Sequence, residues 1–164
     1  DVSEDKPVLL RPGAVTQDMI EDVVGEIDVD PAVYSKPDGN IVPKAPGMKY
    51  KHYSPSAKVI LVSGSMENVI STINEKISTD DKNGLRVGVM ATTQTKDRYI
   101  GGEVLVVGDR TKPETIGANL FKILRKFDFI GVDIVYSEVF DEDGEGAAIM
   151  NRLNKAAGFN YIKC

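Results

Sequence analysis

The 164-residue sequence contains one cysteine, one histidine and no tryptophan, and only 7% of its residues are aromatic. The single cysteine, Cys164, excludes an intramolecular disulfide and a zinc site built from cysteines, and it suits a reducing compartment, so we expect a cytoplasmic protein. With His52 as the only histidine, any metal site would have to consist mostly of carboxylates. No apolar run approaches the roughly 20 residues that a membrane-spanning helix needs, so no membrane partner is expected.

Positive charge is also scarce, because 20 Lys and Arg residues face 25 Asp and Glu residues. The resulting net charge of −5 argues against a protein that holds nucleic acid by general neutralisation of its phosphates. A local basic patch is still compatible with this balance. With 41% hydrophobic residues, the chain can bury one core of ordinary size.

The apolar segments are unevenly distributed along the chain. In residues 1–25, a short apolar run at 8–10 predicts a strand, and apolar residues at helical spacing predict a helix at 17–24, with Thr16 as its N-cap and Gly25 at its end. Residues 26–42 are rich in proline and turn formers and have little that could pack, which predicts a linker or a loop ordered by a neighbour. Residues 58–164 carry most of the apolar runs, so we expect the compact domain there.

The compact domain alternates between two patterns. Short runs rich in apolar residues predict buried strands, and apolar stripes at helical spacing predict helices between them. The expected strands lie at 59–62, 86–91, 103–107 and 132–136, and the expected helices at 67–77, 113–127 and 147–157. This order predicts an α/β fold, a small Rossmann-like three-layer domain with a mostly parallel sheet of about four to five strands.

The loops of this domain contain weak candidates for ligand binding. Ser63-Gly64-Ser65 follows the first strand but lacks the glycine and lysine pattern of a phosphate loop, which favours a helix cap. Gly144-Glu145-Gly146 precedes a helix N-terminus, where backbone donors could bind an anion, yet four acids at 141–145 would repel it. These acids could bind Mg²⁺ or Ca²⁺, but their spacing matches no EF-hand loop, which favours a solvated acidic turn.

The stretch from Lys44 to Pro55, here called the strap, has no helical or strand periodicity and combines cations with aromatic residues. Two interpretations are open: its side chains could stack on a base and neutralise phosphates, or they could pack within a linker. The residues concerned are Lys49, Tyr50, Lys51, His52 and Tyr53. Arg11, after the first strand, could bind a carboxylate or phosphate bidentately or form a surface ion pair. We find no Ser/His/Asp constellation that avoids His52.

Three segments, 7–16, 45–55 and 146–157, resemble marks of the long-form threonylcarbamoyl-AMP synthases, which are YrdC-type enzymes with an additional C-terminal domain. The resemblance follows the family's order and spacing over the whole chain. It implies that 1–25 is the terminal segment of a catalytic domain that is otherwise missing, that 26–57 is a linker acting as a lid, and that 58–164 is a C-terminal Rossmann-like domain. Glu145 departs from the pattern, in which an apolar residue is expected.

The resemblance also implies a reaction. In the family, the catalytic domain binds ATP, L-threonine and bicarbonate with Mg²⁺, and it makes threonylcarbamoyl-AMP and diphosphate for tRNA modification to threonylcarbamoyladenosine. The nucleotide-binding residues that it implies in this chain are Arg11, Tyr50, His52, Tyr53 and Lys49, acting together with the missing domain. No catalytic residue or metal ligand is expected in this chain.

We therefore expect a part that is inactive alone, holds no cofactor tightly, does not bind tRNA directly and supplies the lid and a regulatory or docking domain. Two other hypotheses are kept: a stand-alone Rossmann-like module that binds a ligand or a protein, and a structural domain that forms a homodimer.

Overall fold

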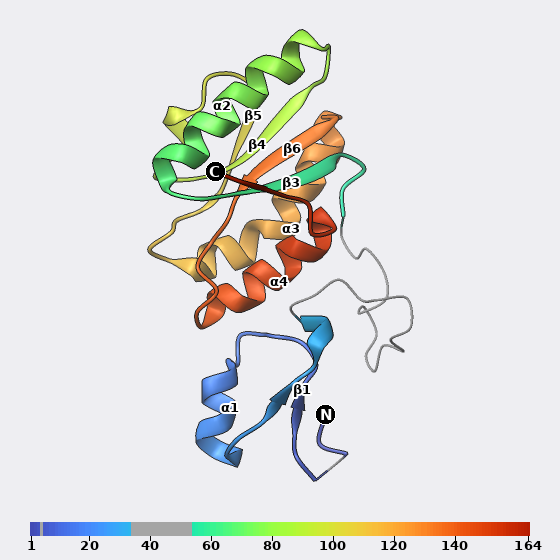
Figure 1. The fold of residues 1–164 in the computed structure, drawn as a ribbon, viewed down its shortest axis with the longest axis vertical. Helices are drawn as coiled ribbons and strands as arrows, with labels where there is room; N and C mark the ends of the chain where they lie inside the picture. Colours follow the sequence, from blue (N-terminus) through green and yellow to red (C-terminus); the bar gives the residue numbers. More distant parts are fainter. Residues whose placement is uncertain (4, 34–53) are drawn as a thin grey trace.

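The computed structural model describes residues 1–3, 5–33 and 54–164. These residues form an α/β domain and a smaller N-terminal unit, which lies next to helix α4 of that domain (Figure 1). Most of the strap, including Lys49, Tyr50, His52 and Tyr53, falls outside the described residues.

The α/β domain is built on a five-stranded parallel sheet with the order β5-β4-β6-β3-β7. Its strands are β3 Lys58–Ser63, β4 Val87–Thr92, β5 Glu103–Gly108, β6 Ile134–Glu138 and β7 Tyr161–Lys163. Its helices are α2 Met66–Lys82, α3 Pro113–Ile130 and α4 Glu145–Ala157, and the short 3₁₀ turn η2 spans Lys96–Arg98. The predicted α/β class with a mostly parallel sheet is confirmed; β7 is the strand that the sequence pattern did not locate.

Both faces of the sheet are covered, which explains the continuous apolar runs of its strands. One face packs against α2 through a cluster that includes Val62, Val89 and Ile73. The other face packs against α3 and α4 through a larger cluster centred on side chains such as Leu61 and Phe127. The strands therefore form the middle of three layers.

Local signals set the ends of the helices. The Ser65 Oγ accepts a hydrogen bond from the backbone N–H of Asn68 at 3.3 Å, so the predicted cap of α2 is confirmed. Pro113 begins α3, where its missing N–H costs nothing, and Gly158 ends α4 in the left-handed conformation.

The N-terminal unit consists of β1 Val8–Leu9, α1 Gln17–Val24, β2 Asp28–Val29 and the 3₁₀ turn η1 Pro31–Val33. Strands β1 and β2 pair in parallel, and α1 connects them. The predicted N-cap of α1 is confirmed, because the Thr16 side chain accepts a hydrogen bond from the N–H of Met19.

Residues 26–33 are ordered by their neighbours, which is one of the two outcomes that the sequence left open. They were predicted to have little that could pack, but Ile27, Ala32 and Val33 are buried. The reason is tertiary: the N–H of Asp28 donates to the carbonyl of Pro7, and Asn151 of α4 donates to the carbonyl of Val33. Neither partner is visible in the local sequence. The domain boundaries at 25 and 57 stay predictions.

Candidate functional site

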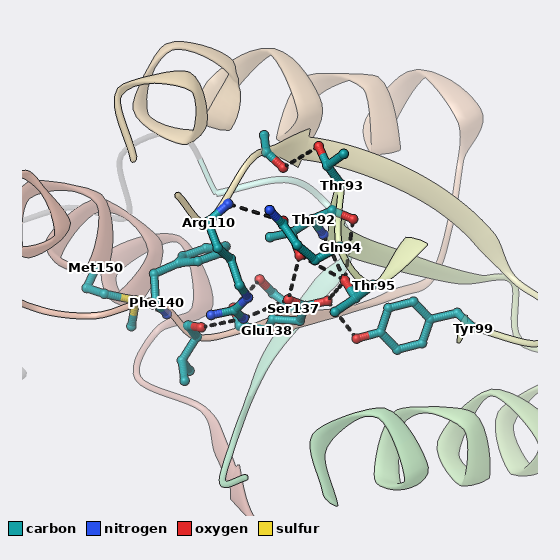
Figure 2. Close-up of polar contacts among 12 residues, drawn as sticks. Thr92, Thr93, Gln94, Thr95, Tyr99, Arg110, Ser137, Glu138, Phe140 and Met150 are labelled. Atoms are coloured by element: carbon teal, nitrogen blue, oxygen red, sulfur yellow. Dashed lines mark hydrogen bonds and ion pairs between the residues drawn. The ribbon is translucent and has the colours of Figure 1, made fainter. Parts of the chain in front are cut away.

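A buried carboxylate lies at the carboxyl edge of the parallel sheet, the edge where open α/β sheets bind ligands. Glu138, the last residue of β6, is 0% exposed. Figure 2 shows its carboxylate between Arg110, from the turn after β5, and Tyr99, from the segment after η2. Thr92, at the end of β4, and Thr95 complete its surroundings. The sheet order brings these segments together because β4 lies between β5 and β6.

Four side chains donate to the two carboxylate oxygens of Glu138. Oε1 accepts hydrogen bonds from Thr95 and from the Tyr99 hydroxyl, the latter at 2.7 Å. Oε2 accepts a hydrogen bond from Thr92 at 3.3 Å and forms an ion pair with the Arg110 guanidinium at 2.7 Å. The charge of Glu138 is therefore paired and hydrogen-bonded, as a buried carboxylate requires.

Tyr99 and Arg110 are each held in this network by their surroundings. Burial raises the pKa of Tyr99 well above its ordinary value, and the neighbouring Glu138 charge raises it further, so the hydroxyl stays protonated and donates. The Arg110 guanidinium also donates to the Val139 carbonyl and lies 5.2 Å from the centre of the Phe140 ring. The cluster offers neither a free base nor a free acid, and it ties together the ends of β4 and β6 and the turn after β5.

The network around Glu138 was not predicted from the sequence. Its members are scattered over positions 92–138, and none forms a motif. One signal was present: a buried apolar strand ends on an acid, Glu138, and the neighbouring strand ends on Thr92. An acid at the end of a strand that is covered on both faces needs a partner, and Arg110 was the available cation.

Ligation of a metal is not indicated in the described part of the chain. Residues 1–3, 5–33 and 54–164 contain no group of three His, Cys, Asp or Glu side chains that could hold an ion. In the same residues, no helix is both long enough and apolar enough to cross a membrane.

Arg11 is the one predicted site residue that the structure describes. It is exposed, and it follows β1 after one residue. Burial lowers the pKa of Lys155 on α4, and the Arg11 charge lowers it further, whereas the Asp30 carboxylate acts in the opposite direction. The charges of Arg11 and Asp30, both in the N-terminal unit, thus act in opposite directions on the pKa of a lysine of the α/β domain.

Helix α4 also contacts both residues that flank the segment 34–53. The Asn151 Nδ2 donates to the Val33 carbonyl at 2.6 Å, and the Ser54 Oγ donates to the Ala156 carbonyl at 2.8 Å. A cleft of about 200 Å³ lies between Gly13 and Ala14 of the N-terminal unit and the N-terminal parts of α3 and α4.

The model of the family described as "Threonylcarbamoyl-AMP synthase, C-terminal domain" matches residues 15–158. The chain belongs to this family. A threonylcarbamoyl-AMP synthase from Pyrococcus abyssi is 46% identical over 163 residues, which cover 99% of this chain and 46% of that protein. One from Bacillus subtilis is 42% identical over 161 residues, which cover 98% of this chain and 44% of that protein. The chain thus spans somewhat less than half the length of these relatives.

Solved structures agree with the family assignment. The crystal structure of P. abyssi Sua5 with L-threonine matches 99% of this chain with a TM-score of 0.85 and 45% identity, over 45% of that protein. The structure of a P. abyssi Sua5 variant, in which a histidine and the next tyrosine are replaced by alanine, matches with a TM-score of 0.87 and 44% identity, over 100% of this chain and 45% of that protein. The C-terminal Sua5 domain of Pyrococcus horikoshii covers 68% of this chain and 100% of its own, with a TM-score of 0.55 and 36% identity.

Within this member of the threonylcarbamoyl-AMP synthase family, Glu145 has a simple structural place. It is the first residue of α4, it follows Gly144, and it lines the cleft beside Gly13. A carboxylate in the first turn of a helix is stabilised by the helix dipole. The acid is therefore compatible with the fold at the position where the family pattern led us to expect an apolar side chain.

Proposed function

We propose that this chain is the C-terminal part of a threonylcarbamoyl-AMP synthase, which converts ATP, L-threonine and bicarbonate into threonylcarbamoyl-AMP and diphosphate for tRNA modification in the cytoplasm. The observation that carries the proposal is the alignment of nearly the whole chain with less than half of such synthases. The remaining half of those relatives is then the principal partner of this chain. In this proposal, ATP and Mg²⁺ are bound with the help of that half.

The N-terminal unit supports the proposal because it is an unfinished fold. It has two paired strands of two residues each and one helix of eight residues, fewer strands than an independently stable sheet needs. The apolar face of α1 is open to solvent: Val23 is 83% exposed, and Met19 and Val24 are more than half exposed. We infer that residues 1–25 complete the sheet and core of the catalytic half.

The strap and Arg11 are the proposed contribution of this chain to nucleotide binding. Arg11 would pair with a phosphate, and the strap residues Tyr50, His52, Tyr53 and Lys49 would fold over the catalytic mouth and exclude water from a labile intermediate. Two observations favour this. The charge of Arg11 acts on Lys155 of α4, so Arg11 is within electrostatic reach of a second cation, with the Asp30 carboxylate acting in the opposite direction. In addition, the P. abyssi variant alters an adjacent histidine and tyrosine, and this chain has such a pair at its only histidine.

The α/β domain is proposed to regulate and dock rather than to catalyse. Its most buried polar cluster, around Glu138, holds no acid or base that is free to move a proton. The chain alone should therefore have no synthase activity.

The first experiment measures diphosphate release that depends on L-threonine and bicarbonate. The full-length synthase should release diphosphate, and this chain alone should not. In full-length protein, Arg11→Ala should raise the KM for ATP at least several-fold. The matched control is Arg125→Ala, which removes an exposed arginine of α3. Equal kinetics of the two variants would remove Arg11 from the site, and a full-length protein without this activity would refute the proposed function.

Binding measurements distinguish this proposal from the hypothesis of a stand-alone Rossmann-like module. Calorimetry of the chain with ATP and with threonylcarbamoyl-AMP should show no tight binding, because the proposed site is incomplete without the catalytic half. Micromolar or tighter binding to the chain alone would contradict that. Light scattering of the same sample at high concentration tests the dimer hypothesis.

A further inference from the structure

The cleft between the N-terminal unit and the α/β domain has charged groups of both signs in its walls. Gly13 and Ala14 line it from the N-terminal unit, and residues of α3 and α4 line it from the α/β domain. The charged side chains among them are Glu114, Glu145 and Arg152. A concave site with a few converging polar groups is a candidate for binding a small molecule.

Helix α4 presents a single face to this cleft. Its lining residues are at positions 145, 148, 149 and 152, which is the spacing of neighbours on one side of a helix. This face begins with an acid, continues with Ala148 and Ile149, and ends with a base. Glu145 and Arg152 are seven residues apart, or about 10.5 Å along the axis at 1.5 Å per residue. A small ligand therefore has room between the two opposite charges.

The Arg152 guanidinium is held in place and still has donors to offer. It lies over the Phe121 ring of α3, with 5.7 Å between the guanidinium carbon and the ring centre. A guanidinium stacked on an aromatic ring keeps N–H groups at its edge, which can donate bidentately to a carboxylate. Within residues 1–3, 5–33 and 54–164, Arg152 forms no ion pair. It is therefore available to an anionic group of a ligand.

The two carboxylates of the cleft are likewise available. Glu114 lies in the first turn of α3 and Glu145 in the first turn of α4, where the helix dipole stabilises a negative charge. Neither carboxylate forms an ion pair or accepts a hydrogen bond from another residue that the structure describes. Their oxygens can therefore bind cationic groups of a ligand.

The size and the charges of the cleft together define a class of ligand. Its volume of about 200 Å³ is several times the roughly 30 Å³ that a water molecule occupies in the liquid. It is smaller than the roughly 300–1,000 Å³ of sites for drug-sized ligands, so it suits a molecule of the size of one amino acid. Two acids and one base are matched by two cations and one anion, and a basic α-amino acid carries that set.

We propose that this cleft binds a free basic α-amino acid such as L-lysine. The α-carboxylate pairs with Arg152, the two ammonium groups pair with Glu114 and Glu145, and the methylene chain contacts Ile149. Such a ligand touches both the N-terminal unit and the α/β domain, so its binding holds the two together. Because both acids are exposed, each pair contributes little, and we expect a Kd of about 1 mM. The inference does not depend on the proposed function.

The first test is an NMR titration of the chain with L-lysine at constant ionic strength. The amides of Gly13, Ala14, Gly117 and Ala148 should shift together. L-norleucine lacks only the side-chain cation, and L-lysinamide lacks the carboxylate; each should bind at least about threefold more weakly. No shift of these amides up to about 20 mM L-lysine, or equal affinities for L-lysine and L-norleucine, would overturn the proposal.

The second test removes the arginine of the cleft. Arg152→Met keeps an apolar side chain beside Phe121 and removes the donors, so L-lysine should bind at least about fivefold more weakly. Arg125→Met is the matched control, because Arg125 is an exposed residue of α3 that does not line the cleft. Its Kd should stay within twofold of the unmodified chain. The same Kd for both variants would refute the assigned role of Arg152.

Glu145→Gln keeps the proposal testable if Arg152→Met does not fold, because Glu145 is exposed and is the first residue of α4. It should weaken L-lysine binding at least about threefold, whereas Glu75→Gln, at an exposed position of α2, should leave the Kd unchanged. Equal affinities of these two variants would refute the pairing of the ligand with the acids. None of these measurements needs synthase activity, so their failure leaves the proposed function standing.

Discussion

Replacing Glu138 by glutamine tests whether the buried network stabilises the domain through charge or merely through shape. The substitution keeps the size of the side chain and removes one negative charge that the structure pairs with Arg110 at 2.7 Å. The amide nitrogen of the new side chain would face the hydroxyls of Thr95 and Tyr99, which can rotate to accept. The amide oxygen would face Arg110, which then keeps a hydrogen bond but loses its counter-charge.

The magnitude follows from burial. Removing one partner of a fully buried ion pair costs roughly 3–5 kcal/mol. Glu138 is 0% exposed, but Arg110 keeps 24% of its side chain in contact with water and also contacts the Phe140 ring. We therefore expect a loss at the lower end, about 3 kcal/mol. For a chain of this length, about 2–4 °C of Tm corresponds to each kcal/mol, so Tm should fall by about 6–12 °C.

The assay is urea unfolding followed by circular dichroism, with Glu75→Gln as the control. Glu75 is an exposed residue of α2, so its loss of charge should change the unfolding free energy by less than about 0.5 kcal/mol. Arg110→Met alone and combined with Glu138→Gln completes a double-mutant cycle. The two losses should overlap by at least about 1 kcal/mol. Equal unfolding free energies of Glu138→Gln and Glu75→Gln, or strictly additive losses in the cycle, would refute the charge argument.

Three further predictions concern the packing, the helix capping and the alkaline stability of the fold. Gly88→Ala would place its Cβ 2.6 Å from the Phe127 ring, so it should lower the unfolding free energy in urea by about 1–3 kcal/mol. The Cβ of Gly117→Ala would meet nothing closer than 3.7 Å, and because this glycine lies inside a helix, the variant should raise the unfolding free energy by about 0.5–1 kcal/mol. The reverse order of stabilities would contradict the packing. Ser65→Ala removes the α2 cap and should lower the unfolding free energy by about 1 kcal/mol. Ser65→Asp keeps a capping oxygen and should retain most of the original stability. Burial and a hydrogen bond to a carboxylate raise the pKa of Tyr136 above its ordinary value of 10.0. The native state therefore keeps a proton that the unfolded state releases, and the free energy of unfolding should decline above pH 10. In Tyr136→Phe this decline between pH 9 and 11 should be shallower, and the same slope of unfolding free energy against pH in both proteins would refute the linkage.

The sheet and helices of the α/β domain could be predicted because their local sequence and their tertiary environment agree. β3 contains a continuous branched run, β4 is buried along its whole length, and α2 and α3 show the apolar stripe that packs on the sheet. The short strands are different. β2 has two residues and β7 has three, and each exists because a neighbouring strand offers hydrogen bonds. No local pattern predicts such strands.

The candidate site residues also differ in whether the sequence could identify them. Arg11 and the strap were candidates from their residue types, and the family resemblance supplied their expected role; the structure adds that the Arg11 charge acts on Lys155. Glu138 and Asn151 could not be identified, because what distinguishes each is a partner brought close by topology, 28 positions away for the first and 118 for the second. Burial of a polar group is a tertiary property, and a single sequence does not contain it.

The position of β3 in the sheet has a consequence for how the protein is made. β3 is the first strand of the α/β domain to leave the ribosome, yet its neighbours are β6 and β7, with Lys58 opposite Ile134 and Leu61 opposite Tyr161. Its apolar side chains and free backbone groups therefore have no strand partner until the last third of the chain has been synthesised. Such delayed, non-local pairing slows folding and leaves an exposed edge during synthesis. A nascent chain that stalls before residue 134 would be the form most in need of a chaperone.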